Sequence, residues 1–423
     1  MTADRPASRA ASRTRPPALA DGAVLTVGLI VNPVAGIGGP AGLKGSDGID
    51  VQREALARGA SPRAGERATQ AVRALLARRP EVRILTVAGP MGEDSARAAG
   101  AHPELLRLVP AGASPDLPRT GAALASPEPV PPAPAGPSSA ADTTAAVAAM
   151  RGVDLLLFAG GDGTARDVLD GSPSCPVLGI PAGVKVYSGC FAVSPATAGV
   201  MAAEFGGDTA GATVDAEVVD LDEEAYRRGR VSPRLYGTLR VPAARARLSG
   251  RKTGSSSAAP GSAEGIAREV VARMRPGVRY VLGPGATTMA VGRRLGLATT
   301  LLGVDVVQDG ELVAADVADS ELLDFVRGRE THAVVSVIGG QGFVLGRGNQ
   351  QISPAVLKMI MTSGGLIVLA TQQKLAGLGG RALLADTGDP ETDALVSGHV
   401  SVITGYRESA MYRICSAIEE FVA

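Results

Sequence analysis

The feature that most restricts the fold of this chain is an apolar strand that ends in a glycine-rich turn and passes directly into a helix. The apolar run at residues 153–159 leads into Gly-Gly-Asp-Gly-Thr at residues 160–164, and helix-forming residues follow from Ala165. Glycines let the backbone approach a bulky anionic ligand, and a helix N-terminus favours negative charge. The pattern predicts an α/β domain with a phosphate-type loop at the end of one strand.

A single carboxylate, Asp162, lies in the middle of this loop. A carboxylate that served only as scaffolding would repel phosphate, so its presence indicates catalysis or the handling of a metal ion. A turn aspartate that caps the following helix is the structural alternative. Capping does not explain the glycines on both sides, so the sequence predicts phosphoryl transfer with Asp162 as the catalytic residue.

Composition excludes several classes of function. The chain has 423 residues, with 42 basic and 42 acidic side chains, so no net charge recruits nucleic acid or an anionic membrane. Aromatic residues make up 3% and tryptophan is absent, which disfavours stacking on single-stranded nucleic acid. No apolar run approaches the roughly 20 residues that span a bilayer. We therefore expect small-molecule partners, and neither nucleic acid nor a membrane.

The three cysteines have no metal-ligand spacing, and their odd number argues against a disulfide framework. A reduced, cytoplasmic setting is expected. Residues 1–22 contain several arginines but no apolar segment of a secretory signal, and they are interpreted as a disordered tail rather than a transit peptide.

The length suffices for two domains. We expect an N-terminal α/β domain at 23–210, interrupted by a Pro/Ala-rich insertion at 111–141, and a C-terminal β-rich or mixed domain at 211–423 with a flexible loop at about 245–265. Short apolar runs predict buried parallel strands, and helical spacing with nearby stop signals predicts helices at 66–79 and 142–150. The expected strands are 23–31, 82–87, 153–159, 176–181, 235–241, 280–282, 333–338 and 366–370.

Four further motifs accompany the Gly-Gly-Asp-Gly-Thr loop in order. They are Val-Asn-Pro-Val-Ala-Gly at 31–36, Gly-Leu-Lys-Gly-Ser-Asp at 42–47, Gly-Ile-Pro-Ala-Gly-Val-Lys at 179–185 and Gly-Ala-Thr-Thr at 285–288. Together they resemble the ATP-NAD kinase family. The late stretch 339–350 makes the chain most similar to the branch associated with acetoin catabolism.

The resemblance implies transfer of the γ-phosphoryl group of ATP to the 2′-hydroxyl of the adenosine ribose of NAD. Asp162 would accept the hydroxyl proton or orient the hydroxyl, and Mg²⁺ would be held through the ATP phosphates, with no metal ligands identified in the chain. A homo-oligomer is also implied, and the active site is expected in a cleft between the domains. The candidate nucleotide-binding residues are Asn32, Gly160, Gly161, Gly163, Thr164, Gly183, Lys185, Glu217, Gly285, Thr287 and Thr288.

Several of these assignments have structural alternatives. Asn32 precedes Pro33 and could simply initiate a turn. Lys44 and Arg347 are candidate phosphate contacts, because lysine supplies a point charge and the arginine fork matches phosphate geometry; a solvated surface position is the alternative for each. Asp305 interrupts an apolar strand and is either a buried, paired carboxylate or an edge residue.

One departure from the family pattern concerns the acceptor. Ordinary NAD kinases carry an Asn-Glu pair that holds the adenosine ribose, and this chain has Ala216 and Glu217 in the corresponding stretch. The alternatives are therefore a kinase of the same superfamily that acts on another small hydroxylated metabolite or a lipid, or a catalytically silent nucleotide-binding regulator. No basic amphipathic segment supports the lipid.

Overall fold

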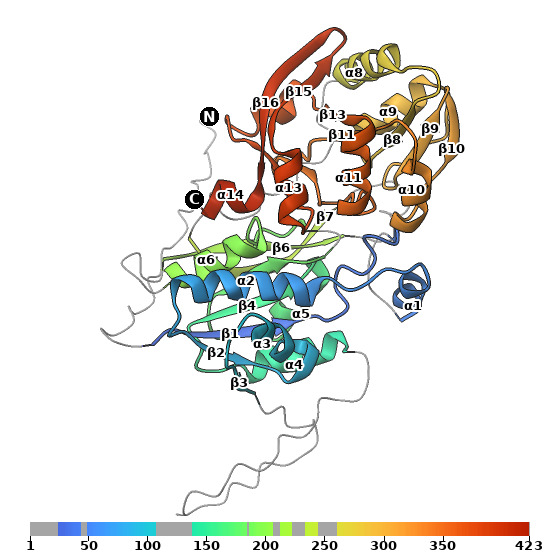
Figure 1. Cartoon of the computed structure of the whole chain (residues 1–423). Coiled ribbons are helices and arrows are strands. Elements are labelled where there is room, and N and C mark those ends of the chain that lie inside the picture. Colours follow the sequence, from blue (N-terminus) through green and yellow to red (C-terminus); the bar gives the residue numbers. More distant parts are fainter. Residues whose placement is uncertain are drawn as a thin grey trace, which may run out of the picture.

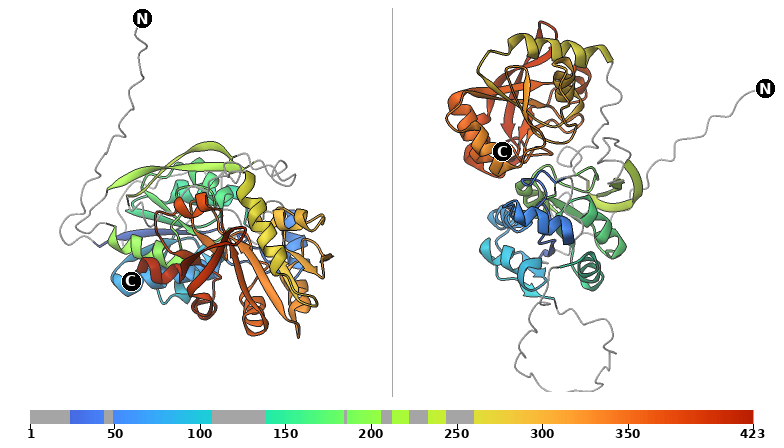
Figure 2. Two further views of the ribbon diagram at one scale, coloured as in Figure 1. Left: turned by 90° about the horizontal axis from the view of Figure 1, so that it is seen from above. Right: turned by 90° about the vertical axis from the view of Figure 1, so that its right-hand side faces the viewer.

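The computed structural model describes residues 24–43, 49–106, 138–183, 186–205, 212–221, 233–243 and 260–422. The predicted tail at 1–22 lies outside the described residues, as do most of the segments predicted as an insertion at 111–141 and a loop at 245–265. The described chain forms two lobes, one above the other in Figure 1 and in the right-hand view of Figure 2.

The first lobe is built on a five-stranded sheet in the order β3-β2-β1-β4-β5, and every neighbouring pair is parallel. Fully buried strands such as β4 read as continuous apolar runs because both faces of the sheet are covered. The parallel N-terminal sheet predicted from sequence is confirmed. The strands are β1 (Thr26–Val31), β2 (Arg83–Thr86), β3 (Glu104–Leu105), β4 (Leu155–Gly160) and β5 (Val177–Pro181).

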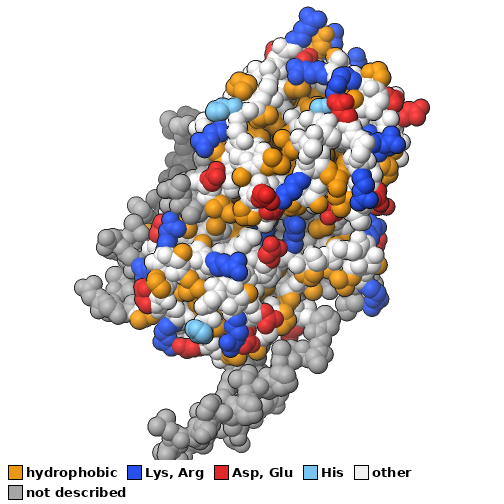
Figure 3. Space-filling view, in the orientation of Figure 1, with side chains coloured by type: hydrophobic (Ala, Val, Ile, Leu, Met, Phe, Trp, Pro, Cys, Tyr) orange, Lys and Arg blue, Asp and Glu red, His pale blue; other side chains and the backbone are white. Residues whose placement is uncertain are grey.

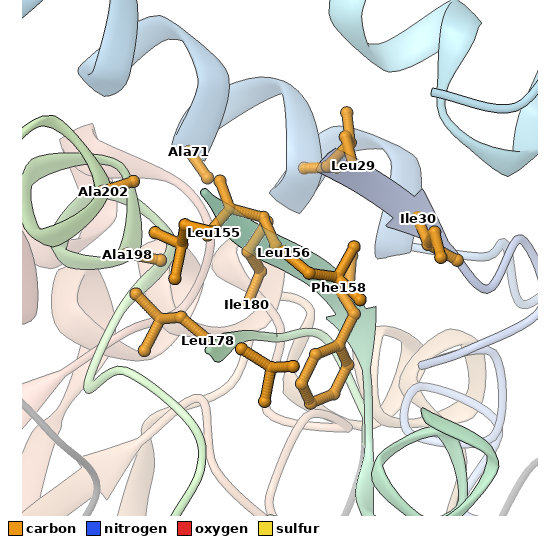
Figure 4. Packing of buried hydrophobic residues seen from close by; sticks show 14 of the residues in the cluster. Leu29, Ile30, Ala71, Leu155, Leu156, Phe158, Leu178, Ile180, Ala198 and Ala202 are labelled. Carbon is orange, nitrogen blue, oxygen red and sulfur yellow. The ribbon is translucent and has the colours of Figure 1, made fainter. Parts of the chain in front are cut away.

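Helices cover both faces of this sheet (Figure 1), with α2 and α6 packed together against β4 and β5. Ala71 of α2 and Ala198 of α6 lie over Leu155 and Leu178 (Figure 4). A Cβ atom at Gly199 would lie 2.0 Å from the Ala71 carbonyl oxygen, so the close crossing of α2 and α6 requires glycine there. The helical elements of this lobe are α1 (Ile49–Ala57), α2 (Ala64–Arg78), the 3₁₀ turn η1 (Gly89–Met91), α3 (Glu93–Ala98), α4 (Ala140–Ala149), α5 (Asp162–Asp170) and α6 (Pro195–Glu204).

A two-stranded antiparallel ribbon, β6 (Thr213–Leu221) and β7 (Pro233–Pro242), lies between the two lobes in Figure 1. Its inward side chains Ala216, Val218 and Leu239 belong to the apolar core of the first lobe. The ribbon therefore packs as part of the first lobe's core, and the predicted division of the chain at residue 210 stays a prediction.

The second lobe contains a nine-stranded mixed sheet in the order β10-β9-β8-β11-β13-β15-β16-β14-β12. Strands β8, β11, β13 and β15 run parallel, whereas β9, β10 and β16 enter through antiparallel pairs. The mixed α/β second domain expected from sequence is confirmed. The strands are β8 (Arg279–Leu282), β9 (Asp305–Gln308), β10 (Glu311–Ala314), β11 (Thr331–Ser336), β12 (Phe343–Leu345), β13 (Gly365–Leu369), β14 (Leu383–Ala385), β15 (Gly398–Gly405) and β16 (Glu408–Ser416).

Two predicted boundaries were wrong. Helix α4 begins at Ala140 rather than after Asp142, because Ser139 and Asp142 form a capping box. Helix α8 begins at Pro260, inside the segment predicted as a loop. The helices of the second lobe are α8 (Pro260–Arg273), α9 (Ala286–Arg294), α10 (Asp319–Val326), α11 (Pro354–Ser363), α12 (Gln372–Ala376), α13 (Pro390–Val396) and α14 (Ala417–Val422).

Within the described part of the chain, none of the helices combines the length and apolar character needed to cross a bilayer.

Candidate functional site

The strand order of the first sheet determines where a ligand can approach. The chain runs from β1 outward to β2 and β3, and then returns to place β4 on the other side of β1. In open α/β sheets the crevice at such a reversal, outside the carboxyl ends of the two central strands, is the usual ligand site. Asn32 follows β1 and the 160–164 loop follows β4, so both predicted motifs lie at this reversal of the strand order.

Asp162 is the first residue of α5 and is 8% exposed. Its carboxylate accepts hydrogen bonds from the backbone N–H of Tyr187, at 3.0 and 2.8 Å to its two oxygens, and from that of Ser188 at 2.9 Å. The N-cap of α5 is Gly161, which has no side chain. The helix-capping alternative for Asp162 is therefore wrong, and the carboxylate instead anchors the segment that follows β5.

Asn32 and Thr164 join the loops after β1 and β4. The Asn32 amide donates to the Thr164 hydroxyl at 3.0 Å, and the Asn32 side-chain oxygen also accepts from the Val34 N–H at 3.3 Å. Asn32 therefore closes a turn and also contacts the glycine loop, and its contact with a nucleotide stays a prediction. A Cβ atom at Gly160 would lie 2.2 Å from the Thr164 hydroxyl oxygen, so glycine at 160 makes room for Thr164.

The loop after β5 is joined to the same place. The N–H groups of Ala182 and Gly183 both donate to the Gly160 carbonyl oxygen at 2.9 Å. Gly163 is the second residue of α5, so Gly161, Gly163 and Gly183 all lie at the carboxyl edge of the sheet. Lys44 and Lys185, two predicted phosphate contacts, lie outside the described residues.

Strand β6 reaches the segment that Asp162 anchors. The Gly189 N–H donates to the Glu217 carbonyl oxygen at 2.8 Å, and the Val219 N–H donates to the Ser188 hydroxyl at 3.0 Å. The Glu217 side chain is exposed, whereas Ala216 is 7% exposed and packs in the first core. The 216–217 stretch is therefore linked to Asp162 through the segment at 188–189, which hydrogen-bonds to both.

A second glycine turn connects β8 to α9 in the upper lobe. Gly285 has φ +135°, and a Cβ atom there would lie 2.8 Å from the Ser336 hydroxyl oxygen, so both backbone and space favour glycine. Thr287 and Thr288 follow in the first turn of α9 and are 3% and 1% exposed. Thr288 donates to the Gly285 carbonyl oxygen at 2.8 Å, and Thr287 accepts from the Lys374 ammonium at 3.4 Å.

A hydrogen bond and apolar packing connect this turn to the Asp162 loop. The Gly285 N–H donates to the Leu301 carbonyl oxygen at 2.8 Å, and the next residue, Leu302, packs against the apolar cluster formed by Tyr187 and Val219. The Gln341 amide donates to the Val186 carbonyl oxygen at 3.1 Å. The glycine turns of the two lobes therefore meet around the segment at residues 186–188.

Asp305 stabilises the loop that leads to this junction. It is 1% exposed and accepts from the Thr300 N–H at 2.7 Å and from the Asp316 N–H at 2.9 Å. Burial raises the pKa of the Asp305 carboxyl, and these donors oppose the shift. Asp305 is thus a buried carboxylate, and it fixes the loop that carries Leu302.

Arg347 lies elsewhere in the interface between the lobes. Its guanidinium donates to the Val193 carbonyl oxygen at 2.7 Å and to Asp386 at 3.4 Å, and it lies 4.5 Å from the Phe343 ring centroid. Burial lowers its pKa to about 10. Asp386 also binds Arg67 of α2 at 2.6 Å. The described contacts of Arg347 are structural, and its role as a phosphate contact stays a prediction.

Metal-ligating groups are sparse in the part of the chain that the structure describes, where no three His, Cys, Asp or Glu side chains are arranged to hold an ion. Acidic and basic side chains are interspersed over the described residues on the face in Figure 3, without a large patch of one sign. At the first glycine loop, the side-chain oxygen atoms of Asp162 and Asn32 are of the type that ligates Mg²⁺. This ion usually takes most of its ligands from phosphates and water.

Comparison with known families agrees with this arrangement. The model of the ATP-NAD kinase N-terminal domain matches residues 27–207, and the model of the ATP-NAD kinase C-terminal domain matches residues 275–414.

The chain belongs to the ATP-NAD kinase family. The two matches cover the parallel sheet with the Asp162 loop and the sheet with the Gly285 turn, in the same order as the motifs. Searches of curated proteins and of solved structures found no significant match. Membership of the acetoin-associated branch stays a prediction.

Sequence reasoning missed several residues of the junction. Tyr187 and Ser188 act through backbone N–H groups, which leave no side-chain signature. Arg67 lies among the small residues of an otherwise ordinary amphipathic helix. Lys374 did have a signal, because it follows the predicted buried strand 366–370 by four residues, at an end where parallel strands place ligand-binding groups.

Proposed function

We propose that this protein is an ATP-dependent kinase that transfers the γ-phosphoryl group of ATP to a hydroxyl of a small molecule, with the 2′-hydroxyl of the adenosine ribose of NAD as the first candidate acceptor. Membership of the ATP-NAD kinase family supports a phosphotransferase. The observation that carries the proposal is the meeting of two strand–glycine turn–helix units, at Asp162 and at Gly285, around one backbone segment.

In this proposal the chain contributes mainly positioning and electrostatics, as phosphoryl transfer requires. The glycine turns present backbone N–H groups and helix N-termini to phosphate oxygens. Asp162 lies in the same turn, where its carboxylate can accept a hydrogen bond from the acceptor hydroxyl and aim it at the phosphorus. Mg²⁺, when bound with ATP, neutralises charge on the phosphate oxygens.

The contacts of Asp162 favour an orienting role. Two backbone N–H groups already stabilise its negative charge through three hydrogen bonds. Backbone donors hold the carboxylate in a fixed position, and its oxygens remain good acceptors of further hydrogen bonds. We therefore assign Asp162 to holding the hydroxyl, and this assignment accounts for a fixed carboxylate in a phosphate-type turn.

The acceptor has a second candidate, because Ala216 occupies the place where ordinary NAD kinases carry an amide. The Ala216 methyl group is buried in the first core and offers no hydrogen bond. Losing such an amide weakens binding of a ribose hydroxyl by about 1–3 kcal/mol unless another group replaces it. This observation favours another small hydroxylated metabolite as the alternative acceptor.

The deciding experiment measures ADP release from Mg-ATP with NAD, with NADH and with a pool of hydroxylated metabolites, for the wild type and for Asp162→Asn. NADP formation that disappears in the variant supports NAD as the acceptor. ADP release with another acceptor supports the kinase and replaces the substrate. Tight ATP binding without turnover for any acceptor would refute the kinase and favour a regulatory protein.

A folding control is needed, since Asp162 also anchors residues 187 and 188. The side-chain amide that Asp162→Asn introduces would place an N–H group against backbone donors. Melting temperatures and ATP affinities of both proteins should therefore be compared. A variant that retains ATP binding and loses turnover separates a direct role in the reaction from loss of the loop.

A further inference from the structure

Gln341 brings a side-chain amide of the second lobe to the segment that Asp162 anchors. Its Nε2 donates to the Val186 carbonyl oxygen at 3.1 Å, and the two residues are 155 positions apart in the chain. Both residues are buried, so the hydrogen bond lies in a low dielectric where it is stronger than in water. The contact joins the two lobes one residue away from the backbone that binds Asp162.

The peptide group between Val186 and Tyr187 forms hydrogen bonds on both of its sides. Its carbonyl oxygen accepts from Gln341, and its N–H donates to the Asp162 carboxylate at 3.0 and 2.8 Å. The peptide is trans and planar, so its C=O and N–H bonds point in opposite directions. A donor at the carbonyl oxygen also polarises the peptide and strengthens its N–H as a donor. Gln341 and Asp162 therefore hold one rigid plane from two lobes.

The backbone of Gln341 is fixed within the second lobe. Its N–H and that of Gly342 both donate to the Ile338 carbonyl oxygen, at 3.3 and 2.9 Å, in a turn that follows β11. Gly340 and Gly342 have φ +80° and +83°, a region that glycine adopts without strain. The Leu384 N–H of β14 donates to the Gly342 carbonyl oxygen at 3.0 Å. The Gln341 side chain therefore follows the position of the second sheet.

We propose that Gln341 is a positioning residue, which fixes the orientation of the Asp162 carboxylate through the peptide group between Val186 and Tyr187. The inference rests on the proposed kinase function, because that function assigns Asp162 to holding the acceptor hydroxyl. A misplacement of about 1 Å in such a group can cost about a hundredfold in rate. Gln341 thus makes the geometry at Asp162 depend on the lobe that carries the Gly285 turn.

The first test compares kcat and KM of the wild type and Gln341→Leu, with Mg-ATP and the acceptor that supports ADP release. Arg63→Met is the matched control, because Arg63 Nη1 also donates across the lobes to a backbone carbonyl, that of Thr387, at 3.1 Å. We expect Gln341→Leu to lower kcat about tenfold, the equivalent of one net hydrogen bond, without a change in KM for ATP. Arg63→Met should retain the kcat of the wild type. An unchanged kcat in Gln341→Leu, or an equal loss in both variants, would overturn the inference.

Gln341→Glu supplies a pH profile that a merely structural role would not produce. A protonated glutamate can donate to the Val186 carbonyl oxygen, whereas an ionised one cannot. Burial raises the pKa of a carboxyl, so the donating form is present below the raised pKa and is lost as the pH rises through it. The kcat of Gln341→Glu, divided by that of the wild type at the same pH, should therefore recover between about pH 8 and about pH 5. A ratio that stays constant, as expected for Gln341→Leu, would overturn the inference.

Amide hydrogen exchange tests the same contact without turnover. The Tyr187 N–H should exchange about tenfold faster in Gln341→Leu than in the wild type, relative to the amides of β4, which report global unfolding. Unchanged relative exchange would overturn the inference. A wild type without turnover would refute the proposed kinase, and the exchange rate would still decide whether Gln341 fixes the Asp162 loop. If Gln341→Leu does not fold, Gln341→Glu in acid and at neutral pH is the deciding comparison.

Discussion

Replacing Asp386 by asparagine should strongly destabilise the contact between the lobes. The Asp386 carboxylate binds the Arg67 guanidinium at 2.6 and 2.7 Å and the Arg347 guanidinium at 3.4 Å. The side chains of Arg67, Arg347 and Asp386 are 8%, 7% and 7% exposed. The substitution therefore leaves two buried guanidinium groups without their common counter-charge.

The expected loss follows from this burial. Removing one partner of a buried ion pair typically costs about 3–5 kcal/mol, because the remaining charge is desolvated without compensation. The pair Arg83–Glu104 is the matched control, since its side chains are 57% and 58% exposed at a distance of 2.8 Å. Glu104→Gln should cost less than about 1 kcal/mol, because water screens an exposed pair.

Urea denaturation followed by circular dichroism would measure the loss of unfolding free energy in both variants. A separate early transition of one lobe would show directly that the interface has weakened. A loss for Asp386→Asn that equals that of Glu104→Gln would refute the reasoning. The triple variant Arg67→Met, Asp386→Leu, Arg347→Met is a further check. It should recover most of the stability, because apolar side chains of similar size need no counter-charge.

Three other predictions concern single positions. Gly160→Ala should lose about 1–3 kcal/mol in urea denaturation, because its Cβ atom would lie 2.2 Å from the Thr164 hydroxyl, whereas Gly65→Ala meets only an ordinary contact at 3.5 Å and should not lose stability. A backbone N–H and an arginine lower the pKa of Glu269 below its usual 4.5. The ionised carboxylate therefore stabilises the folded protein above pH 4.5, and this contribution is lost as the pH falls through the lowered pKa. The melting temperatures of wild type and Glu269→Gln should therefore converge in acid, and a constant gap would contradict this. Burial raises the pKa of the Cys190 thiol, and all three cysteines are buried. A thiol reagent should therefore label them only after denaturation. Fast labelling of the native protein would contradict this prediction.

Much of the fold could be predicted because a buried parallel strand is recognisable from a short apolar run in the sequence. The runs at 23–31, 153–159 and 176–181 became β1, β4 and β5, since strands covered on both faces must be apolar along their whole length. The glycine loops after these strands were predicted for the same local reason. Boundaries were less accurate, as the start of α8 shows, because Pro260-Gly261-Ser262 resembles a loop and also suits a helix N-terminus.

The candidate site was predictable in its parts but not in its contacts. The sequence identified Asp162, and it identified Gly285 as a second turn. It could not show that Asp162 binds the backbone of Tyr187, because a backbone N–H is the same at nearly every position. Lys374 had a signal in its place after a strand, whereas the sequence could not show that Arg347 shares the Asp386 carboxylate with Arg67 of the first lobe.

The sequence by itself determined the parallel sheet, its glycine turns and the carboxylate in the first of them, since each depends on residues that are neighbours in the chain. Only the tertiary structure decided which distant groups meet. Arg67 and Asp386 are 319 positions apart, and the β6–β7 ribbon shares the core of the first lobe. Local patterns record whether a segment is buried, but its partners depend on how the whole chain is connected and packed.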